Sequence, residues 1–259
     1  FDNFVTALTN PAYLSPLAEI FAWNMVFALG SVGFTFALGL GLALAVQPDQ
    51  VRGKAFYRSM YIVPYAIPAF ISAVVWRGLL NGQFGQVNDL LGRLGIDPIP
   101  WLQSPFWAKV AVLLVNLWLG FPYMFLITSG ALQSIPQELT EAALVDGANA
   151  RRVFRSVKLP LLLVSTAPLL IGSFAFAFNN FVLVFTLTNG GPPILDAAIP
   201  VGSTDLLITL TYDIALAGGV GNRFALAAAM SIFIFFIVLI VSSISFRFTK
   251  RLEEIYGSL

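Results

Sequence analysis

Amide and hydroxyl side chains lie among aromatic rings in two long uncharged stretches of this sequence. One cluster occupies residues 116–123, beginning with Asn116, and the other occupies residues 173–181, which include Ser173 and Asn180. Amides hydrogen-bond to hydroxyl groups and aromatic rings stack on the apolar face of a sugar, so this combination favours a neutral sugar. Asn, Gly and Pro also serve helix packing in membranes, and for any one residue that alternative stays open. Two such clusters together predict a polar path through the protein.

The composition argues against catalysis. The sequence contains no His and no Cys, which removes the imidazole base, the thiolate nucleophile and nearly every zinc or iron site. It also contains no Gly-x-x-x-x-Gly-Lys-Ser/Thr phosphate loop. We therefore expect no covalent catalysis, no metal site and no nucleotide site in this chain, and the net charge of +1 gives no indication of a nucleic-acid partner.

The overall apolar character predicts a membrane protein. Of the 259 residues, 58% are hydrophobic and 10% are charged, and the mean hydropathy is +0.84. Soluble domains carry roughly 25% charged residues, so most of this surface must face lipid. A membrane-crossing helix needs about 20 apolar residues. The uncharged stretches predict an all-α membrane protein, one domain over residues 1–259, with about five transmembrane helices at residues 20–46, 59–76, 110–132, 161–187 and 224–246.

Prolines and glycines predict the shape of these helices. Pro64 and Pro68 predict a second helix with two kinks, and Pro122 predicts a kink or an unwound turn in the third. Four glycines of the first helix are interpreted as packing residues, since only the small hydroxyls of Ser31 and Thr35 accompany them. These glycines are Gly30, Gly33, Gly39 and Gly41.

The distribution of basic residues predicts the orientation, because loops rich in Lys and Arg stay in the cytoplasm. With the amino end outside, ten of the fourteen basic residues lie inside. They are Arg52, Lys54, Arg58, Arg151, Arg152, Arg155, Lys158, Arg247, Lys250 and Arg251, and the other four are Arg77, Arg93, Lys109 and Arg223. The amino end is therefore expected to be external and the carboxyl end cytoplasmic.

Two segments outside the spans are expected on the external side. Residues 79–106 predict a loop with a short helix around residues 87–94, and residues 206–217 predict an interfacial or externally packed helix too short to cross the bilayer. The sequence begins at Phe1, without Met and without a basic leader, so we expect a fragment that lacks amino-terminal helices.

The loop between the third and fourth helices, residues 133–160, is the most specific feature. Pro136 suits the start of a short helix, Gly147 supplies a break, and an Arg-rich second helix leads to Pro160. Two short helices joined at a glycine form a rigid surface to which another protein can bind. The alternative from periodicity alone is an ordinary interfacial amphipathic loop.

Family resemblance favours the first interpretation. Glu141, Ala142 and Ala143, followed by Gly147 after three intervening residues, resemble the EAA loop of binding-protein-dependent ABC importer permeases. The likeness extends over essentially the whole chain, where the sequence resembles the larger membrane subunit of the maltose-type importer. The matching segments are residues 52–55, 64–68, 116–123, 159–160, 173–181 and 188–192.

The resemblance implies roles for particular residues. Glu141, Ala142, Ala143 and Gly147 would couple the chain to a cytoplasmic ATPase subunit. The family's substrate-contacting positions match Asn116, Leu119, Gly120, Tyr123, Ser173, Phe176 and Asn180. Ala177 departs from the maltose-type pattern, which has Asn there, so one amide contact is missing.

The resemblance also implies the partners. They are a second homologous permease, a cytoplasmic ATPase dimer that binds ATP and Mg²⁺, an extracytoplasmic sugar-binding protein, the sugar and the bilayer of a bacterial cytoplasmic membrane. The implied activity is alternating-access import of a maltodextrin-like oligosaccharide. Alternatives are import of another disaccharide, a glycerol phosphate or a polyamine, a passive channel, and a membrane-embedded enzyme; the uncharged spans speak against the charged cargoes and the enzyme.

Overall fold

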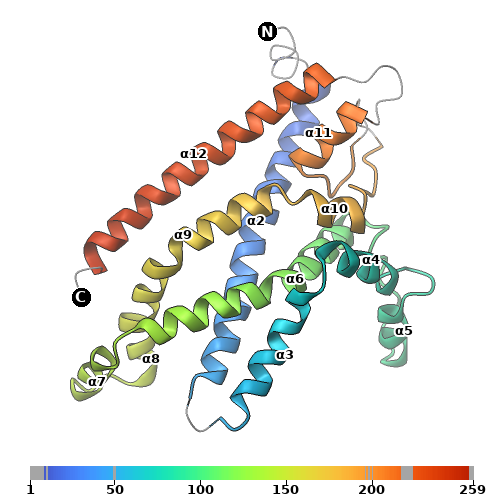
Figure 1. Cartoon of the computed structure of the whole chain (residues 1–259). Coiled ribbons are helices and arrows are strands. Elements are labelled where there is room, and N and C mark those ends of the chain that lie inside the picture. Colours follow the sequence, from blue (N-terminus) through green and yellow to red (C-terminus); the bar gives the residue numbers. More distant parts are fainter. Residues whose placement is uncertain are drawn as a thin grey trace.

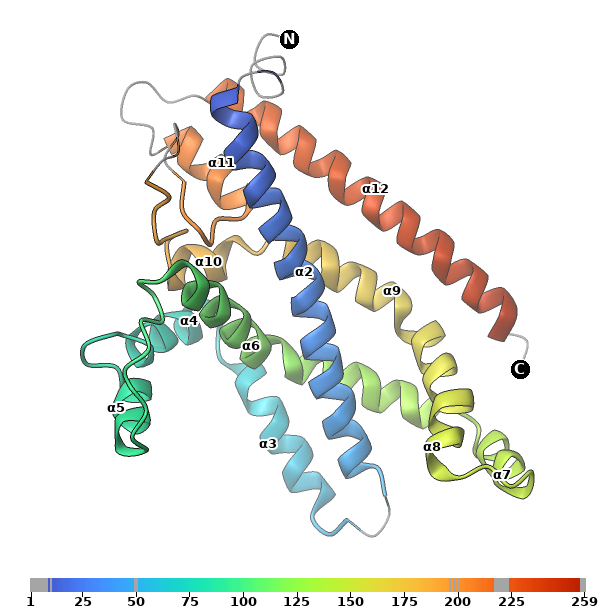
Figure 2. The ribbon, with the colours of Figure 1, turned by 180° about the vertical axis from the view of Figure 1, so that it is seen from behind.

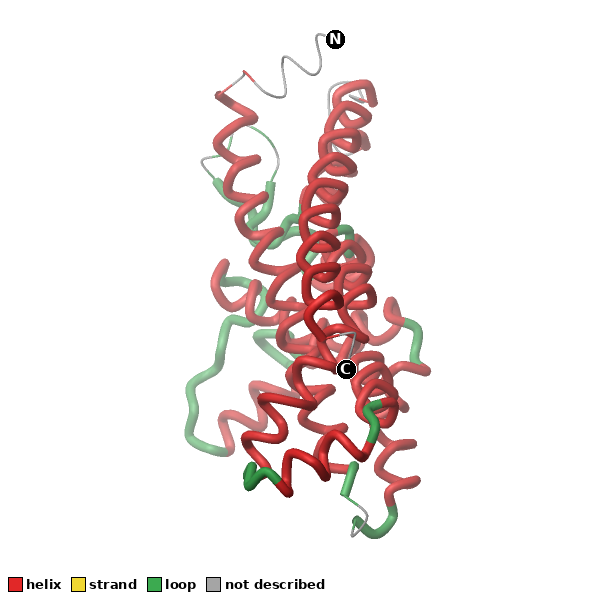
Figure 3. The backbone as a smooth tube through the Cα atoms, turned by 90° about the vertical axis from the view of Figure 1, so that its left-hand side faces the viewer, coloured by secondary structure: helices red, strands yellow, loops and turns green. Residues whose placement is uncertain are grey.

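The computed structural model describes residue 9 and residues 11–48, 51–195, 197, 199, 201–216 and 224–256. These residues form helices joined by turns and loops, with one isolated β-bridge between Pro193 and Gly202 (Figure 3). The helices are α2 (Pro11–Val46), α3 (Lys54–Ala66), α4 (Ala69–Leu79), α5 (Gln86–Arg93), α6 (Pro105–Ser134), α7 (Gln137–Val145), α8 (Ala150–Val153), the π-helix η1 (Phe154–Lys158), α9 (Leu159–Phe178), α10 (Phe181–Leu187), α11 (Leu207–Leu216) and α12 (Phe224–Tyr256) (Figure 1).

Four helical segments of the described chain are long and apolar enough to cross a membrane. They are Leu14–Val46, Pro105–Ser134, Ala150–Phe178 and Phe224–Arg247. The pair α3 and α4 passes the same test as one bent segment, which gives up to five crossings. The expected all-α membrane fold is confirmed.

Helix α2 runs through the centre of the molecule and contacts α6 and α9, while α12 packs along α9 (Figures 1 and 2). The contact with α6 depends on Gly39, because a Cβ atom there would lie 2.6 Å from the backbone of Met124. Packing is thus confirmed as the role of Gly39. At Gly33 and Gly41 a Cβ would meet no atom of the described chain within 4 Å, so packing within this chain does not require a glycine at either position.

The second span has one break where the sequence predicted two kinks. Helices α3 and α4 meet at 90°, and Pro64 stays inside α3. The break lies at Ile67 and Pro68, because a proline pushes the residue before it out of the helical region, and Ile67 has φ −88° and ψ 126°. Pro122 likewise stays inside a continuous α6 and is buried, so the predicted unwinding there is wrong. Neighbouring helices hold proline-containing membrane helices together.

The predicted fourth helix, residues 161–187, is also broken. Helix α9 ends at Phe178, and α10 begins at Phe181. The intervening asparagines satisfy backbone groups that a continuous helix would use: the Asn180 side chain accepts a 3.3 Å hydrogen bond from the Leu183 N–H and caps α10. From α2, the fully buried Asn24 donates to the Phe178 carbonyl at 3.1 Å and accepts from the Leu207 N–H at 2.8 Å.

Two short helices form where the sequence placed them outside the spans. Helix α5 (Gln86–Arg93) is held by Asn88, whose amide bonds both backbone groups of Ile99 at 2.9 and 3.1 Å. Helix α11 buries Leu207, Leu210 and Ile214 against α12 and its neighbours, which corresponds to the externally packed alternative.

Candidate functional site

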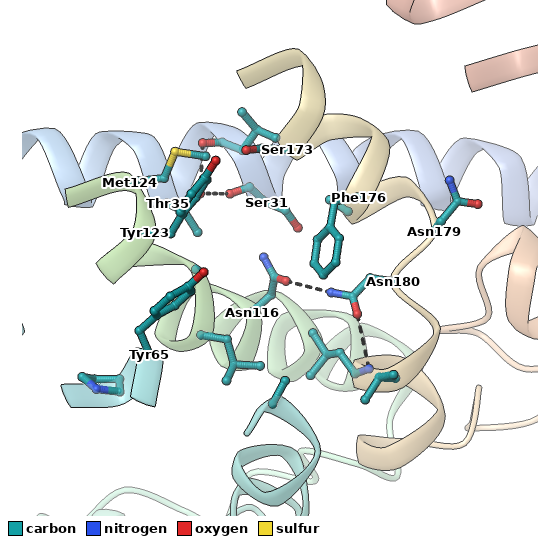
Figure 4. Close-up of a pocket in the computed structure, with 18 of the residues that line it drawn as sticks. Ser31, Thr35, Tyr65, Asn116, Tyr123, Met124, Ser173, Phe176, Asn179 and Asn180 are labelled. Atoms are coloured by element: carbon teal, nitrogen blue, oxygen red, sulfur yellow. Dashed lines mark hydrogen bonds between the residues drawn. The ribbon is translucent and has the colours of Figure 1, made fainter. Parts of the chain in front are cut away.

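A cavity of about 700 Å³ lies between α2, α6 and α9, next to the two helix breaks. All seven residues that the sequence analysis singled out for substrate contact line it, namely Asn116, Leu119, Gly120, Tyr123, Ser173, Phe176 and Asn180 (Figure 4). The α6 residues recur every three or four positions and so share one face of that helix. The structure therefore brings together two clusters that lie about 60 residues apart in the sequence.

The centre of the cavity wall is a pair of amides. The Asn180 Nδ2 atom donates to the Asn116 Oδ1 atom at 3.2 Å, while Asn180 Oδ1 caps α10. The Asn116 Nδ2 atom donates to no residue in the described part of the chain, and Figure 4 shows it inside the cavity. These amides can donate hydrogen bonds to a ligand without any charge.

Aromatic rings form another part of the cavity wall. Tyr65, at the end of α3, stacks on Tyr123 with ring centroids 6.3 Å apart and an interplanar angle of 19°. Phe176 is 74% exposed and faces the cavity (Figure 4). Tyr65 was absent from the predicted set, although its position between two prolines in residues 64–68 marked a helix end.

Helix α2 supplies two hydroxyl residues, Ser31 and Thr35, that were absent from the predicted set. The Thr35 hydroxyl donates to the Ser31 carbonyl at 2.6 Å, and the Thr35 methyl lies against Gly120, where a Cβ would come within 2.8 Å. Ser31 lines the cavity with a buried hydroxyl that has no hydrogen-bond partner. The signal that could have found them is their spacing of four residues on one helix face.

The lining is electrically neutral. None of its described side chains carries a formal charge. Ala177 lines the cavity and is buried, so the position where the maltose-type pattern has Asn offers only a methyl group here. Asn179 also lies at the edge of the cavity, and its amide donates to the Ala175 carbonyl at 3.0 Å (Figure 4).

The predicted coupling residues lie far from this cavity, at the other end of α6 and α9 (Figure 1). Glu141 and Ala142 are exposed and Ala143 is half-buried, all on α7. Gly147 ends the helix in the left-handed region with φ +79°, which a residue with a Cβ adopts at a cost. Two apolar side chains outside the predicted coupling set, Leu144 and Val145, are 52% and 88% exposed on the same helix.

The turn at residues 188–192 is locked to the segment before α11. Thr188 and Thr204 share a 2.7 Å hydrogen bond between hydroxyls, and Thr204 also donates to the Gly191 carbonyl at 2.7 Å. Asp205 accepts from the Gly202 N–H and the Thr209 hydroxyl, each at 2.7 Å. Burial raises the pKa of Asp205 to about 6, and these two hydrogen bonds oppose part of that rise.

Residues 36–254 match the binding-protein-dependent transport system inner membrane component family, so the chain belongs to that family of transporter permease subunits. Among its relatives is the maltose/maltodextrin transport system permease protein MalF of Vibrio vulnificus (strain YJ016), 46% identical over 250 residues. MalF of Escherichia coli (strain K12) is 44% identical over 251 residues. These alignments cover 96% of this chain but 48% and 49% of the relatives, so the chain spans about half of their length.

Solved structures share the fold. A bacterial ABC transporter involved in the import of the acidic polysaccharide alginate matches with a TM-score of 0.78 at 23% identity, over 97% of this chain and 83% of that one. The inward-facing MetNI methionine ABC transporter matches with a TM-score of 0.64 at 15% identity, over 95% and 99% of the two chains. Both are ABC transporters, in agreement with the predicted permease core.

Proposed function

We propose that this chain is the membrane-spanning part of an ABC importer that moves a maltose- or maltodextrin-like oligosaccharide by alternating access. The observation that carries the proposal is the uncharged cavity in which the amides of Asn116 and Asn180 lie beside the Tyr65, Tyr123 and Phe176 rings. Amides would bond the sugar hydroxyls and the rings would stack on its apolar faces. The printed names of the relatives support the same substrate class.

In this proposal, α7 couples the chain to ATP hydrolysis. Its exposed Glu141, Leu144 and Val145 would insert into a cleft of a cytoplasmic ATPase subunit, and Gly147 would fix the turn behind them. ATP and Mg²⁺ would bind to that ATPase dimer. Closure of the dimer would move α7, and α6 and α9 would carry the movement to the cavity.

The remaining partners complete the pathway in a bacterial inner membrane. A second homologous permease would form the other half of the route, and an extracytoplasmic sugar-binding protein would deliver the substrate. The bias of basic residues favours an external amino end and a cytoplasmic α7. Two residues in this orientation argument, Phe1 and Arg223, lie outside the described part of the chain.

Charged cargoes fit the cavity less well. An anionic glycerol phosphate or a cationic polyamine would need an opposite charge to offset its desolvation, and the described lining offers none. A different neutral disaccharide is the alternative substrate, because it would also need no charge in the lining. Ala177, where the maltose-type pattern has Asn, is the lining position that would favour such a sugar over maltose.

The test is reconstitution of the protein with the proposed ATPase, second permease and binding protein in proteoliposomes. ATP hydrolysis is measured across a panel of mono-, di- and oligosaccharides, with glycerol phosphate and spermidine as charged controls. We expect stimulation by maltodextrins and none by the charged solutes. Stimulation by no sugar, or by a charged solute alone, would refute the substrate class.

A further inference from the structure

Helix α9 continues backward through the α7–α9 loop without a break. Val153, Phe154 and Leu159 all have right-handed helical backbone angles where α8, η1 and α9 join, so residues 150–178 form one helix of 29 residues. The apolar part, α9 itself, is 20 residues or about 30 Å, which equals the hydrocarbon thickness of a bilayer.

The first nine residues of this helix directly precede its apolar part. They contain four basic residues and no acidic one. Arg151, Arg152 and Arg155 are exposed and Lys158 is half-buried, while Val153 packs inward at 4% exposure. The exposed basic side chains thus turn away from the protein directly beside a segment that is long and apolar enough to cross a membrane.

These cations have no ion-pair partner within the described part of this chain. Among the described residues, none of the four basic side chains forms an ion pair, although the acidic residues of α7 lie on a neighbouring element. The carboxyl-terminal part of α12, which packs along α9, adds the exposed Arg247 and Lys250 at the same end of the molecule (Figures 1 and 2). Clusters of basic residues directly beside a membrane-crossing helix attract anionic lipid.

We propose that the basic end of this helix, formed by Arg151, Arg152, Arg155 and Lys158, is a binding site for the phosphate group of an anionic phospholipid. The guanidinium groups bond the phosphate in the bidentate geometry that suits Arg. The bound lipid anchors the segment between α7 and α9 and so fixes the height of α7 relative to the bilayer. This site is independent of the substrate in the cavity.

The test uses the purified protein in neutral detergent, titrated with short-chain phosphatidylglycerol and followed by native mass spectrometry. Phosphatidylcholine is the neutral-lipid control and inorganic phosphate is the free-phosphate control. The variant Arg151→Gln/Arg155→Gln is compared with Arg52→Gln/Arg58→Gln, which removes two exposed basic residues from another part of the sequence. We expect saturable binding of phosphatidylglycerol, weakened about 30-fold in the first variant and changed less than about 3-fold in the second.

Three results would overturn the proposal. They are equal binding of phosphatidylcholine, equal weakening by the two variants, and full competition by inorganic phosphate, which would assign the site to a free anion. A fourth concerns a protein partner: unchanged lipid binding by Arg151→Gln/Arg155→Gln, together with loss of the ATPase subunit from the purified complex, would assign these residues to the ATPase. The variant Arg151→Lys/Arg155→Lys retains the charge and is expected to retain most of the lipid affinity, which separates loss of charge from misfolding.

Discussion

The Nδ2 atom of Asn180 donates a 3.2 Å hydrogen bond to the Oδ1 atom of Asn116, joining the start of α10 to the middle of α6. Both amides are proposed substrate contacts, yet each already has a partner. A sugar must therefore replace this bond or bind to the hydrogens that remain, on Asn116 Nδ2 and on Asn180 Nδ2. Because the same Asn180 side chain caps α10, its binding and structural roles are coupled.

Substitution of Asn180 separates these roles. Asn180→Ala removes the amide donor and the cap, and we expect it to abolish sugar uptake while sparing basal ATP hydrolysis. Asn180→Asp keeps an acceptor for the Leu183 N–H but loses the donor to Asn116, so it should restore the roughly 1 kcal/mol of capping stability without restoring uptake. Uptake and ATPase activity in proteoliposomes give the answer, and equal loss of both activities would mean that Asn180 is a packing residue.

Ser31 is expected to contribute to binding more than to stability. Its buried hydroxyl has no partner, so Ser31→Ala removes an unsatisfied group and should leave the thermal midpoint unchanged or higher. A hydroxyl that bonds a sugar is worth about 0.5–1.5 kcal/mol, which predicts affinity about 2- to 10-fold weaker. Isothermal titration with maltodextrin measures the affinity, and a thermal melt measures the midpoint. An unchanged affinity would show that Ser31 does not contact the sugar.

Gly39 and Gly33 form a matched pair on α2. Gly39→Ala places a Cβ against the Met124 backbone and is expected to lower the free energy of unfolding by about 2 kcal/mol. Gly33→Ala meets no atom within 4 Å and should leave that free energy unchanged or raise it by about 0.5–1 kcal/mol. Thermal unfolding in nanodiscs measures both, and a similar loss from the two variants would contradict the packing argument.

Gly147 is expected to be essential for coupling. Gly147→Pro is incompatible with φ +79°, and we expect basal ATPase activity to remain while sugar no longer stimulates it. The control is Ala150→Pro, at the first position of α8, where proline is tolerated and the preceding Asn149 is already extended at ψ 166°. Normal stimulation in Gly147→Pro would exclude the coupling role of this turn.

The raised pKa of Asp205 predicts a pH dependence of the segment between α10 and α11. Its pKa is about 6 in the folded chain and 3.8 without burial, so the folded state binds the proton more tightly. The resulting contribution to the free energy of unfolding is at most about 3 kcal/mol. It is fully present below about pH 4 and is lost as the pH rises through about 6. Hydrogen exchange of residues 188–209 should slow as the pH is lowered, after correction for intrinsic rates. Asp205→Asn should abolish this pH dependence of the exchange rate, and the control Asp89→Asn, at an exposed site, should retain it. A pH dependence that Asp205→Asn leaves unchanged would mean that other groups cause it.

Sequence reasoning located the cavity because polar groups in apolar helices are few and costly. Asn116 and Asn180 stood out for this reason, and the structure brings both clusters to one place. The break between α9 and α10 was missed, because an uncharged run looks continuous until tertiary partners such as Asn24 are known to satisfy the freed carbonyl. Ser31 was not predicted as a site residue, because a small hydroxyl in a helix normally bonds its own backbone, as Thr35 does.

The absence of formal charge from the described cavity lining has a consequence for experiments on the assembled transporter. Dissolved ions screen attraction between charged groups and have little effect on neutral hydrogen bonds. Sugar capture in the cavity should therefore proceed equally at low and high ionic strength, whereas the proposed lipid contact at Arg151 and Arg155 should weaken as ionic strength rises. Added sodium chloride thus provides a way to vary the anchoring of α7 while leaving the cavity's own affinity unaltered.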